Sequence, residues 1–321
     1  MAVRAAESGE APLLADLADG PPGGFARWTA AEDGVRLRLV AWGAQATGGT
    51  VLVFPGRTEA AEKYGRLAAD LHGLGLASLV IDWRGQGLSD RLLADPAIGH
   101  VARFSDYQRD VAAMVALARD LSLPRPFYLL AHSMGGAIGL RALLGGLDVR
   151  AAAFSAPMWG IAMPARNRLF ARVLPALARP LGLGHRMAPG QPRDSYLLRV
   201  PFAGNTLTTD PAMWDYMRRQ IAAEPRLGLG GPSLIWLAEA LRELRALRAA
   251  PSPALPTLTF LGTAEKVVLS DAIRDRMSRW PSGRLIEIPG AEHEVLMESP
   301  ALRAPVLAAL STHFVRAPAG D

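Results

Sequence analysis

The chain has 321 residues, half of them hydrophobic and a fifth charged, which suits an α/β domain with an insertion and argues against disorder. It contains no cysteine, and this excludes disulfides, a cysteine nucleophile and thiolate metal sites. The net charge of +5 comes with no recognised nucleic-acid-binding motif, so we expect no nucleic-acid partner.

Residues 1–24 predict a loose N-terminal leader that ends in a run of glycine and proline. Acidic residues interrupt this segment, and it lacks the apolar region of a signal peptide. No stretch of about 18 apolar residues occurs elsewhere, so the sequence predicts no membrane-spanning helix. We therefore expect a cytoplasmic protein.

Strand and helix patterns alternate after the leader. Residues 35–40 alternate polar and apolar and predict an antiparallel edge strand, whereas the apolar runs at 50–54, 77–81 and 151–154 predict buried parallel strands. Helical periodicity covers residues 64–74 and 104–121. This alternation predicts an α/β fold, with a mostly parallel sheet and helices on both faces.

The alternation stops at Pro157 and resumes with a strand at residues 258–261. A helix near 271–280, a strand at 284–288 and a closing helix near 301–315 follow. Residues 157–250 have helical stretches but no convincing buried strand. We therefore expect a core of residues 25–156 and 251–321, with 157–250 inserted as a helical cap over the catalytic edge of the sheet.

A strand, a serine and a small-residue helix follow one another in the middle of the core. The apolar run at 127–131 leads into Ser133, and Gly135 and Gly136 open the next helix. This is the context of a nucleophile elbow, in which a sharp turn lifts the serine hydroxyl clear of the sheet. The usual motif is Gly-x-Ser-x-Gly, and Ala131 stands at its first position. The sequence therefore predicts that Ser133 is a nucleophile.

A serine nucleophile needs a base, and the base needs an acid to orient it. In an elbow fold the acid and then the histidine follow the serine, each in a loop after a strand. Of the six histidines, His293 alone lies directly after a late strand. Glu265 is the first acid after the strand at 258–261, and Asp271 is its rival at the start of a predicted helix. We expect Ser133, Glu265 and His293 to form the catalytic triad.

Two backbone amides are expected to form the oxyanion hole. One belongs to Met134, which follows the nucleophile, and the other to Arg57, which follows Pro55 and Gly56 after an early strand. The guanidinium of Arg57 has two alternative roles: it pairs with Glu59 as part of the scaffold, or it faces the substrate.

The chain resembles the α/β-hydrolase superfamily and, within it, the bacterial lysophospholipase and monoacylglycerol lipase group. The resemblance rests on motifs that occur in the expected order between about residue 50 and residue 295: Pro55–Glu59 with Lys63 and Tyr64, Asp82–Ser89, Gly99–Val101, His132–Gly136, Ser155–Met158, Gly262 with Glu265–Val268, and Gly290–His293. The chain departs from the family pattern at Ala131 and at Glu265, which replaces the usual aspartate.

The resemblance implies a serine carboxylester hydrolase without a cofactor or metal, acting on a lysophospholipid or monoacylglycerol through an acyl-enzyme. One alternative is a peptidase or amidase of the proline iminopeptidase type. Another is a catalytically silent binding protein with the same fold. The sequence does not determine the oligomeric state.

The predicted cap combines apolar and basic residues. Met158, Trp159, Met163 and Trp214 either line an acyl-chain pocket or pack the cap onto the core. Residues 157–250 carry thirteen arginines and six acids, a net charge of +7. Arg166, Arg168 and Arg172 flank Phe170, a pattern that either binds an anionic membrane surface peripherally or is a solvated face.

Overall fold

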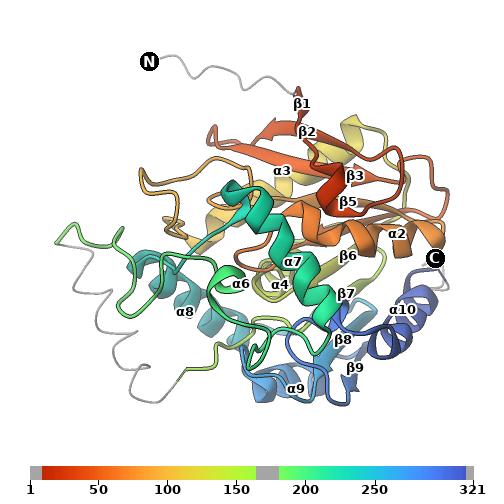
Figure 1. Ribbon diagram of the computed structural model, residues 1–321. Helices are drawn as coiled ribbons and strands as arrows, with labels where there is room; N and C mark the ends of the chain where they lie inside the picture. The colour runs from red at the N-terminus through yellow and green to blue at the C-terminus, as the bar shows by residue number, and fades with distance from the viewer. Residues whose placement is uncertain (1–8, 164–180, 316–321) are drawn as a thin grey trace.

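A computed structural model describes residues 9–163 and 181–315 of the chain (Figure 1). Its nine-stranded sheet has the order β1-β2-β3-β5-β4-β6-β7-β8-β9. The pairs from β5 through β9 are parallel and those from β1 to β5 are antiparallel. The strands are β1 (Glu10–Ala11), β2 (Phe25–Ala30), β3 (Arg36–Trp42), β4 (Thr50–Phe54), β5 (Ala77–Ile81), β6 (Phe127–His132), β7 (Ala152–Ser155), β8 (Thr257–Gly262) and β9 (Gly283–Ile288).

Helices cover both faces of this sheet, as Figure 1 shows. The helices before the cap are α1 (Ala15–Ala18), η1 (Ala61–Tyr64), α2 (Gly65–Gly73), η2 (Phe104–Asp106), α3 (Tyr107–Asp120) and α4 (Met134–Leu144). Between β7 and β8 lie α6 (Tyr196–Arg199), α7 (Pro211–Ala223), η3 (Pro225–Leu227) and α8 (Leu234–Ala249). The chain ends with α9 (Ser270–Ser278), η4 (Val295–Met297) and α10 (Pro300–Val315). The predicted fold class is confirmed.

The central strands are hydrophobic throughout because both of their faces are buried. Along β4, Leu52 and Phe54 pack on one side of the sheet, whereas Val51 and Val53 pack on the other. The first side carries α3, α4 and α9, and the second carries α2 and α10. Alternate side chains of each strand therefore enter two separate cores, which explains the continuous apolar runs in the sequence.

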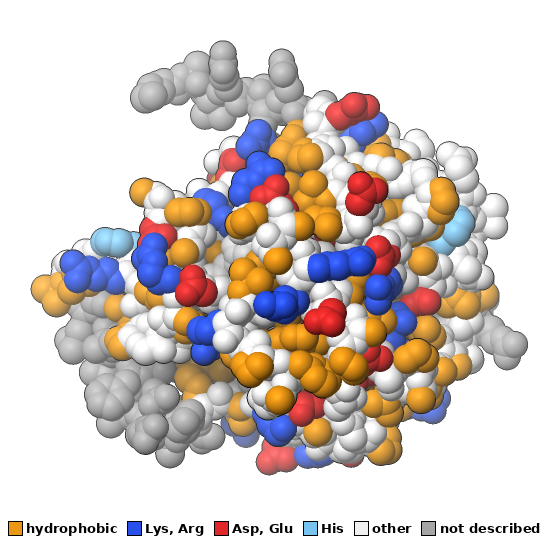
Figure 2. All heavy atoms as spheres, in the orientation of Figure 1, with side chains coloured by type: hydrophobic (Ala, Val, Ile, Leu, Met, Phe, Trp, Pro, Cys, Tyr) orange, Lys and Arg blue, Asp and Glu red, His pale blue; other side chains and the backbone are white. Residues whose placement is uncertain are grey.

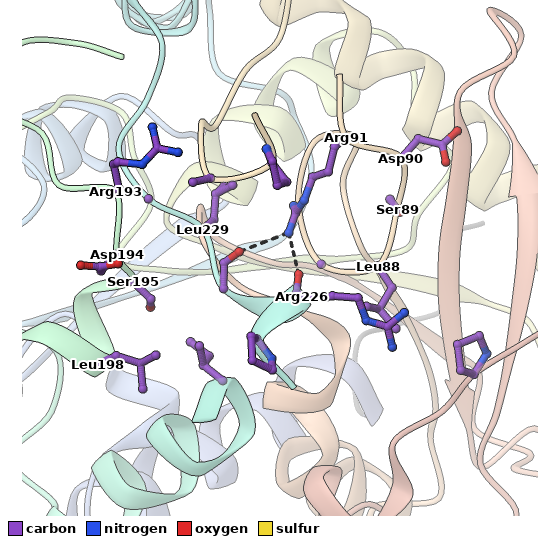
Figure 3. A pocket seen from close by; sticks show the side chains of 18 of the residues that line it. Leu88, Ser89, Asp90, Arg91, Arg193, Asp194, Ser195, Leu198, Arg226 and Leu229 are labelled. Atoms are coloured by element: carbon purple, nitrogen blue, oxygen red, sulfur yellow. Dashed lines mark hydrogen bonds between the residues drawn. The ribbon is translucent and has the colours of Figure 1, made fainter. Parts of the chain in front are cut away.

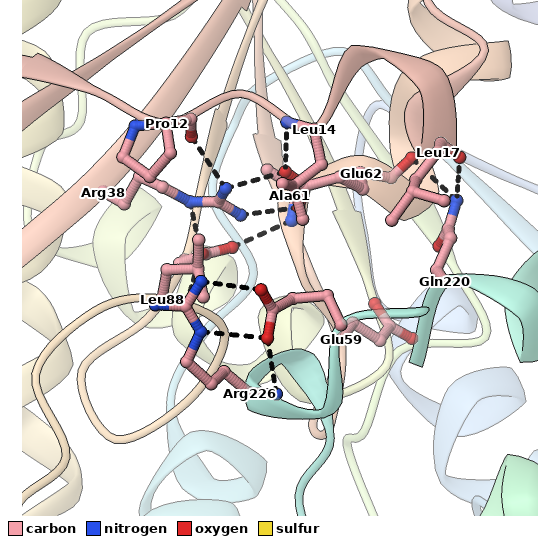
Figure 4. Close-up of polar contacts among 12 residues, drawn as sticks. Pro12, Leu14, Leu17, Arg38, Glu59, Ala61, Glu62, Leu88, Gln220 and Arg226 are labelled. Atoms are coloured by element: carbon pink, nitrogen blue, oxygen red, sulfur yellow. Dashed lines mark hydrogen bonds and ion pairs between the residues drawn. The ribbon is translucent and has the colours of Figure 1, made fainter. Parts of the chain in front are cut away.

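The expectation of a loose leader over residues 1–24 does not hold for residues 9–24. Strand β1 pairs with β2, and the carbonyl of Pro12 accepts a hydrogen bond of 3.1 Å from Arg38. The Leu14 amide donates to Glu62 over 3.3 Å (Figure 4). Arg38 and Glu62 are fully buried and form a two-pronged ion pair, so a core charge network fixes this segment to the domain.

The predicted edge strand at 35–40 is an interior strand. Strand β3 has β2 on one side and β5 on the other, and six of its seven residues are buried. The alternation in its sequence comes from the arginines, because Arg38 is buried as an ion pair rather than exposed. A charged side chain that finds buried partners leaves the same pattern in the sequence as one that faces water.

The part of the cap that the structure describes contains helices and isolated bridges but no named strand. Its boundaries at 157 and 250 remain a prediction. Arg166, Arg168, Phe170 and Arg172 lie outside the described residues. Within the described ranges, no helix has the length and apolar character needed to cross a membrane.

Candidate active site

Ser133 occupies a strained turn between β6 and α4. Its φ of 51° and ψ of −117° put a non-glycine residue at positive φ, which costs energy that the surrounding structure must repay. The Ser133 amide donates to the Ser155 carbonyl over 3.1 Å, and the Met158 amide donates to the Ser133 carbonyl over 2.7 Å. Neighbouring backbone therefore holds the serine in the geometry that was predicted for a nucleophile elbow.

Glycines let helix α4 approach the strands closely. A Cβ at Gly135 would lie 2.1 Å from the Phe54 carbonyl oxygen, so a side chain there would collide with the end of β4. A Cβ at Gly139 would lie 3.2 Å from the methyl group of Ala131. Gly139 thus leaves room for the alanine that replaces the usual first glycine of the elbow.

The three predicted triad residues form one hydrogen-bonded chain. His293 Nε2 lies 3.0 Å from Ser133 Oγ, and His293 Nδ1 lies 2.7 Å from Glu265 Oε2. Because a carboxylate can only accept, these partners place the imidazole proton on Nδ1 and leave Nε2 free to accept from the serine. The geometry is that of a serine, a base and an orienting acid.

Glu265 is the acid that reaches the histidine. Its other oxygen, Oε1, accepts from the amides of Val267 at 2.5 Å and Val268 at 3.1 Å. Burial acts to raise the pKa of the Glu265 carboxyl, but the hydrogen bond and charge of His293, with these two amides, outweigh it and lower the pKa. Asp271 has a side chain that is 99% exposed and pairs with Arg274, so it lies away from the site.

Comparison with known proteins places the chain in a family. It matches the family described as "Serine aminopeptidase, S33" over residues 45–300. The chain belongs to this family of α/β-hydrolases. It is 37% identical over 309 residues to lysophospholipase L2 of Escherichia coli (strain K12), with 90% of this chain and 87% of that protein covered. It is also 30% identical to a probable lysophospholipase L2 of Haemophilus influenzae, covering 83% of each.

Solved structures share the α/β-hydrolase fold at low identity. A soluble variant of monoglyceride lipase from Saccharomyces cerevisiae has a TM-score of 0.72 and 17% identity, covering 99% of both chains. A carboxyl esterase from Bacillus coagulans has a TM-score of 0.71 and 13% identity, covering 92% of this chain and 99% of that one. The family membership makes this protein a serine hydrolase.

The predicted oxyanion donors lie on segments that meet at the elbow of this hydrolase. Met134 is the first residue of α4, and the close approach of Gly135 to Phe54 brings the end of β4 beside it. Arg57 follows that strand end. The assignment of both amides stays a prediction.

The Arg57 guanidinium does not pair with Glu59, which was one of the two roles considered for it. Glu59 is occupied by other donors: Lys63 Nζ at 2.7 Å, the Tyr64 hydroxyl at 2.5 Å and the Gly56 amide at 2.5 Å. Arg57 instead donates to the Gly230 carbonyl at 2.5 Å and lies over Trp236.

A buried ionic cluster behind the triad was missed by sequence reasoning. Lys63 Nζ lies 2.7 Å from Glu59 and 2.6 Å from Glu294. His132 Nε2 lies 3.2 Å from Glu294 and 3.4 Å from Glu59 without a well-aligned hydrogen bond. The rings of His132 and His293 are 4.9 Å apart between centroids. One signal was available, because His132 and Glu294 each adjoin a triad residue in the sequence.

The cluster resembles a metal site in its composition but contains its own cation. Ligand atoms of Glu59, His132 and Glu294 lie within 4.8 Å of one another. The Lys63 ammonium touches both carboxylates and so supplies the positive charge that a metal ion would bring. Burial acts to lower the pKa of Lys63, but the charges of Glu294 and Glu59 outweigh it and raise the pKa.

The four apolar residues predicted for an acyl-chain pocket have different surroundings. Trp159 packs against Phe154 and Trp280 and donates to the Gly136 carbonyl, so its contacts are those of a core side chain. Met158 is buried in the same core. Trp214 packs in the cap against Tyr196 and Phe202, and Met163 is half-buried. A substrate-binding role for these residues stays a prediction.

A cleft of about 680 Å³ lies between the loop after β5 and the described cap (Figure 3). Arg91 lines it and donates to the carbonyls of Gly85, Arg226 and Gly228 at 2.8, 2.6 and 3.2 Å. The cleft lining also includes Gly230, the residue that Arg57 contacts. Two arginines therefore hold the same cap strip, residues 226–230.

Proposed function

We propose that the protein is a serine carboxylester hydrolase that cleaves single-chain lipid esters, lysophospholipids or monoacylglycerols. The hydrogen-bonded chain from Ser133 through His293 to Glu265, built on a strained elbow, carries this proposal. The lipid ester as substrate is drawn from the relatives, since lysophospholipase L2 of E. coli aligns over 90% of this chain.

The reaction runs through an acyl-enzyme. His293 Nε2 takes the proton of Ser133 as the serine oxygen attacks the ester carbonyl, and Glu265 stabilises the imidazolium that forms. The amides of Arg57 and Met134 hold the oxyanion of the tetrahedral intermediate. His293 then protonates the departing alcohol. Water, deprotonated by the same histidine, attacks the acyl-serine and releases the fatty acid.

A fluorophosphonate probe tests the nucleophile. We expect it to label the wild-type protein, and Ser133→Ala to abolish labelling and lower turnover by about 10⁴- to 10⁶-fold, as in other serine triads. Intact-mass spectrometry reports the adduct, and fatty-acid release from a panel of lysophospholipids, acylglycerols and p-nitrophenyl esters reports turnover. Labelling that survives in Ser133→Ala would contradict the assignment.

The family description also names an aminopeptidase, so an amide substrate is the second candidate. An aminoacyl-arylamide placed in the same panel separates the two. Rapid arylamide cleavage without fatty-acid release would replace the lipid-ester proposal with a peptidase.

We further propose that the basic cap collects amphiphilic substrate at anionic surfaces. The support is its net charge of +7, since each basic residue near an anionic membrane contributes about 1 kcal/mol of attraction. On the face shown in Figure 2, basic and acidic side chains are interspersed. The basic cluster to be tested is Arg166, Arg168 and Arg172, which lie outside the described residues. Co-sedimentation with vesicles should rise with anionic lipid and fall with salt, and should weaken when these three become glutamine. Binding that ignores lipid charge and salt would exclude it.

A further inference from the structure

Among the described residues, no carboxylate pairs with the guanidinium of Arg57, and none contributes to the shift of its pKa. It donates to the Gly230 carbonyl at 2.5 Å, and its carbon lies 5.2 Å from the centre of the Trp236 ring. Its Nε is buried and has no hydrogen-bond partner. Burial lowers the pKa of this guanidinium to about 10, so it remains charged at neutral pH. Arg57 is therefore a largely desolvated cation without an anion.

Such an arrangement is costly unless a ligand completes it. A charge removed from water loses hydration that a carbonyl dipole and an aromatic ring replace only in part. An anion with several oxygens would satisfy the free Nε and the charge together, and guanidinium groups bind phosphate in this two-pronged way. Arg57 as a whole is only partly buried, so part of its side chain is open to solvent although its Nε is not.

The surroundings hold the guanidinium in this place. A Cβ at Gly99 would lie 2.5 Å from Arg57 Nη2 and 3.2 Å from Leu229, so a larger residue would displace the side chain. The Gly99 amide donates to the Gly231 carbonyl over 3.0 Å, and the Ser233 amide donates to the Gly99 carbonyl over 2.8 Å. Backbone hydrogen bonds thus fix Gly99 and the cap segment at 231–233 beside the guanidinium.

The predicted oxyanion role of the Arg57 amide points to the kind of ligand. The same residue contributes its amide to the predicted oxyanion hole, so its guanidinium can lie no farther from the predicted place of the ester oxygen than an arginine side chain reaches. In a lysophospholipid, the phosphate is attached to the far end of the glycerol unit that carries the ester. A monoacylglycerol has a neutral hydroxyl there. We propose that Arg57 binds the phosphate of the substrate head group and thereby selects lysophospholipids over monoacylglycerols.

This inference rests on the proposed function, and Arg91 provides a matched control. Arg91 also lacks a carboxylate partner among the described residues and also donates to carbonyls of residues 226–230. It differs from Arg57 in its place, because it lines the cleft and does not follow β4. If Arg57 only anchors this cap strip, glutamine at either position should have similar consequences. If Arg57 binds phosphate, the consequences should differ by substrate.

The test compares lysophosphatidylcholine and monoacylglycerol with the same short acyl chain, both below their critical micelle concentrations. We expect Arg57→Gln to lower kcat/KM for the lysophospholipid by about 10- to 100-fold, the usual effect of losing a charge-assisted hydrogen bond. For the monoacylglycerol the change should be a few-fold at most. Arg57→Lys should recover part of the lysophospholipid preference because it restores the charge without the planar fork. Arg91→Gln should change both substrates by the same factor.

Equal losses on both substrates in Arg57→Gln would overturn the inference and leave Arg57 as an anchor.

Equilibrium binding to Ser133→Ala in phosphate-free buffer separates this outcome from failure of the proposed function. If the wild type hydrolyses neither lipid, the proposed function fails. The inference then stands only if Ser133→Ala binds the lysophospholipid about 10-fold or more tightly than Ser133→Ala/Arg57→Gln does. Added inorganic phosphate should weaken that binding if the head-group phosphate is recognised; binding of inorganic phosphate alone, without lysolipid preference, would contradict it.

Discussion

Glu265 uses both carboxylate oxygens, one to orient His293 and the other to fix its own position. Oε2 accepts from His293 Nδ1 at 2.7 Å, while Oε1 accepts from the amides of Val267 and Val268. From this backbone position the glutamate side chain reaches both the histidine and the two amides. The side chain is therefore held by its own loop while it orients the histidine.

Removing the charge of Glu265 should impair catalysis without unfolding the protein. We expect Glu265→Gln to lower kcat by about 10²- to 10⁴-fold, because the imidazolium loses its stabilising carboxylate and the correct tautomer is no longer enforced. Steady-state kinetics measure this, with Asp271→Asn as the control because Asp271 is exposed and distant. Near-normal activity in Glu265→Gln together with collapse in Asp271→Asn would transfer the role of the acid.

The loop that carries His293 is fastened to the cap by one buried carboxylate. Glu298 Oε2 accepts from the Thr209 amide at 3.0 Å and its hydroxyl at 2.5 Å, and Oε1 accepts from the Glu292 amide at 2.9 Å. The Glu294 amide in turn donates to the Leu207 carbonyl over 2.7 Å. These contacts link residues 207–209 of the cap to both sides of the histidine.

We expect Glu298→Gln to destabilise the protein by about 1–3 kcal/mol, because the new amide group faces donors and leaves one of them unsatisfied. It should also lower kcat, since the His293 loop loses its anchor. Thermal unfolding and kinetics measure the two effects. Glu287→Gln is the control, because Glu287 lies partly exposed on β9 and should change stability by less than about 0.5 kcal/mol. Lower stability with unchanged kcat would mean that Glu298 holds the cap without positioning His293.

The elements that sequence reasoning identified share a physical property. Strands β4, β5 and β8 are buried on both faces, so their apolar runs are unambiguous. Strand β2 was missed because its residues are mostly half-buried, and β1 because it has only two residues. Without these two strands, β3 was predicted to lie at the edge. The triad could be predicted because each of its residues follows the end of a strand. A buried ion such as Lys63 could not, because in a sequence it looks the same as a solvated charge.

At the scale of the whole molecule, the cluster around Lys63 joins three segments that lie far apart in the chain. Glu59 follows β4, Lys63 belongs to η1, His132 ends β6, and Glu294 follows the catalytic histidine. His132 Nδ1 lies 3.0 Å from the Ser155 carbonyl, which extends the connection to β7. A single ammonium group therefore bridges the carboxylates of two of these segments beneath the active site, and its one positive charge offsets part of their negative charge.

Replacing Lys63 should reveal how much its positive charge contributes to the stability of the fold. We expect Lys63→Met to lower the free energy of unfolding by about 3–5 kcal/mol near neutral pH, because it leaves buried carboxylates without their cation. Lys266→Met is the control: Lys266 is largely exposed, and its pair with Glu292 should contribute less than about 1 kcal/mol. Urea unfolding of the three proteins measures the difference.

The cost of Lys63→Met should depend on pH in a defined direction. Burial acts to raise the pKa of Glu294, but the charges of His132 and Lys63 outweigh it and hold the pKa well below the usual 4.5. The stability from this carboxylate is therefore present above pH 4.5 and is lost as the pH falls through the lower folded value. The pKa of Lys63 is raised above 10.5, so its contribution persists up to that pH and is lost only above it.

Without Lys63, Glu294 binds a proton more readily and its charge disappears as the solution becomes acidic. The difference between wild type and Lys63→Met should accordingly be largest between these limits and shrink toward pH 4 and below, as measured by urea unfolding across the acidic range. A difference that stays constant with pH would mean that Lys63 stabilises the fold by packing rather than by charge.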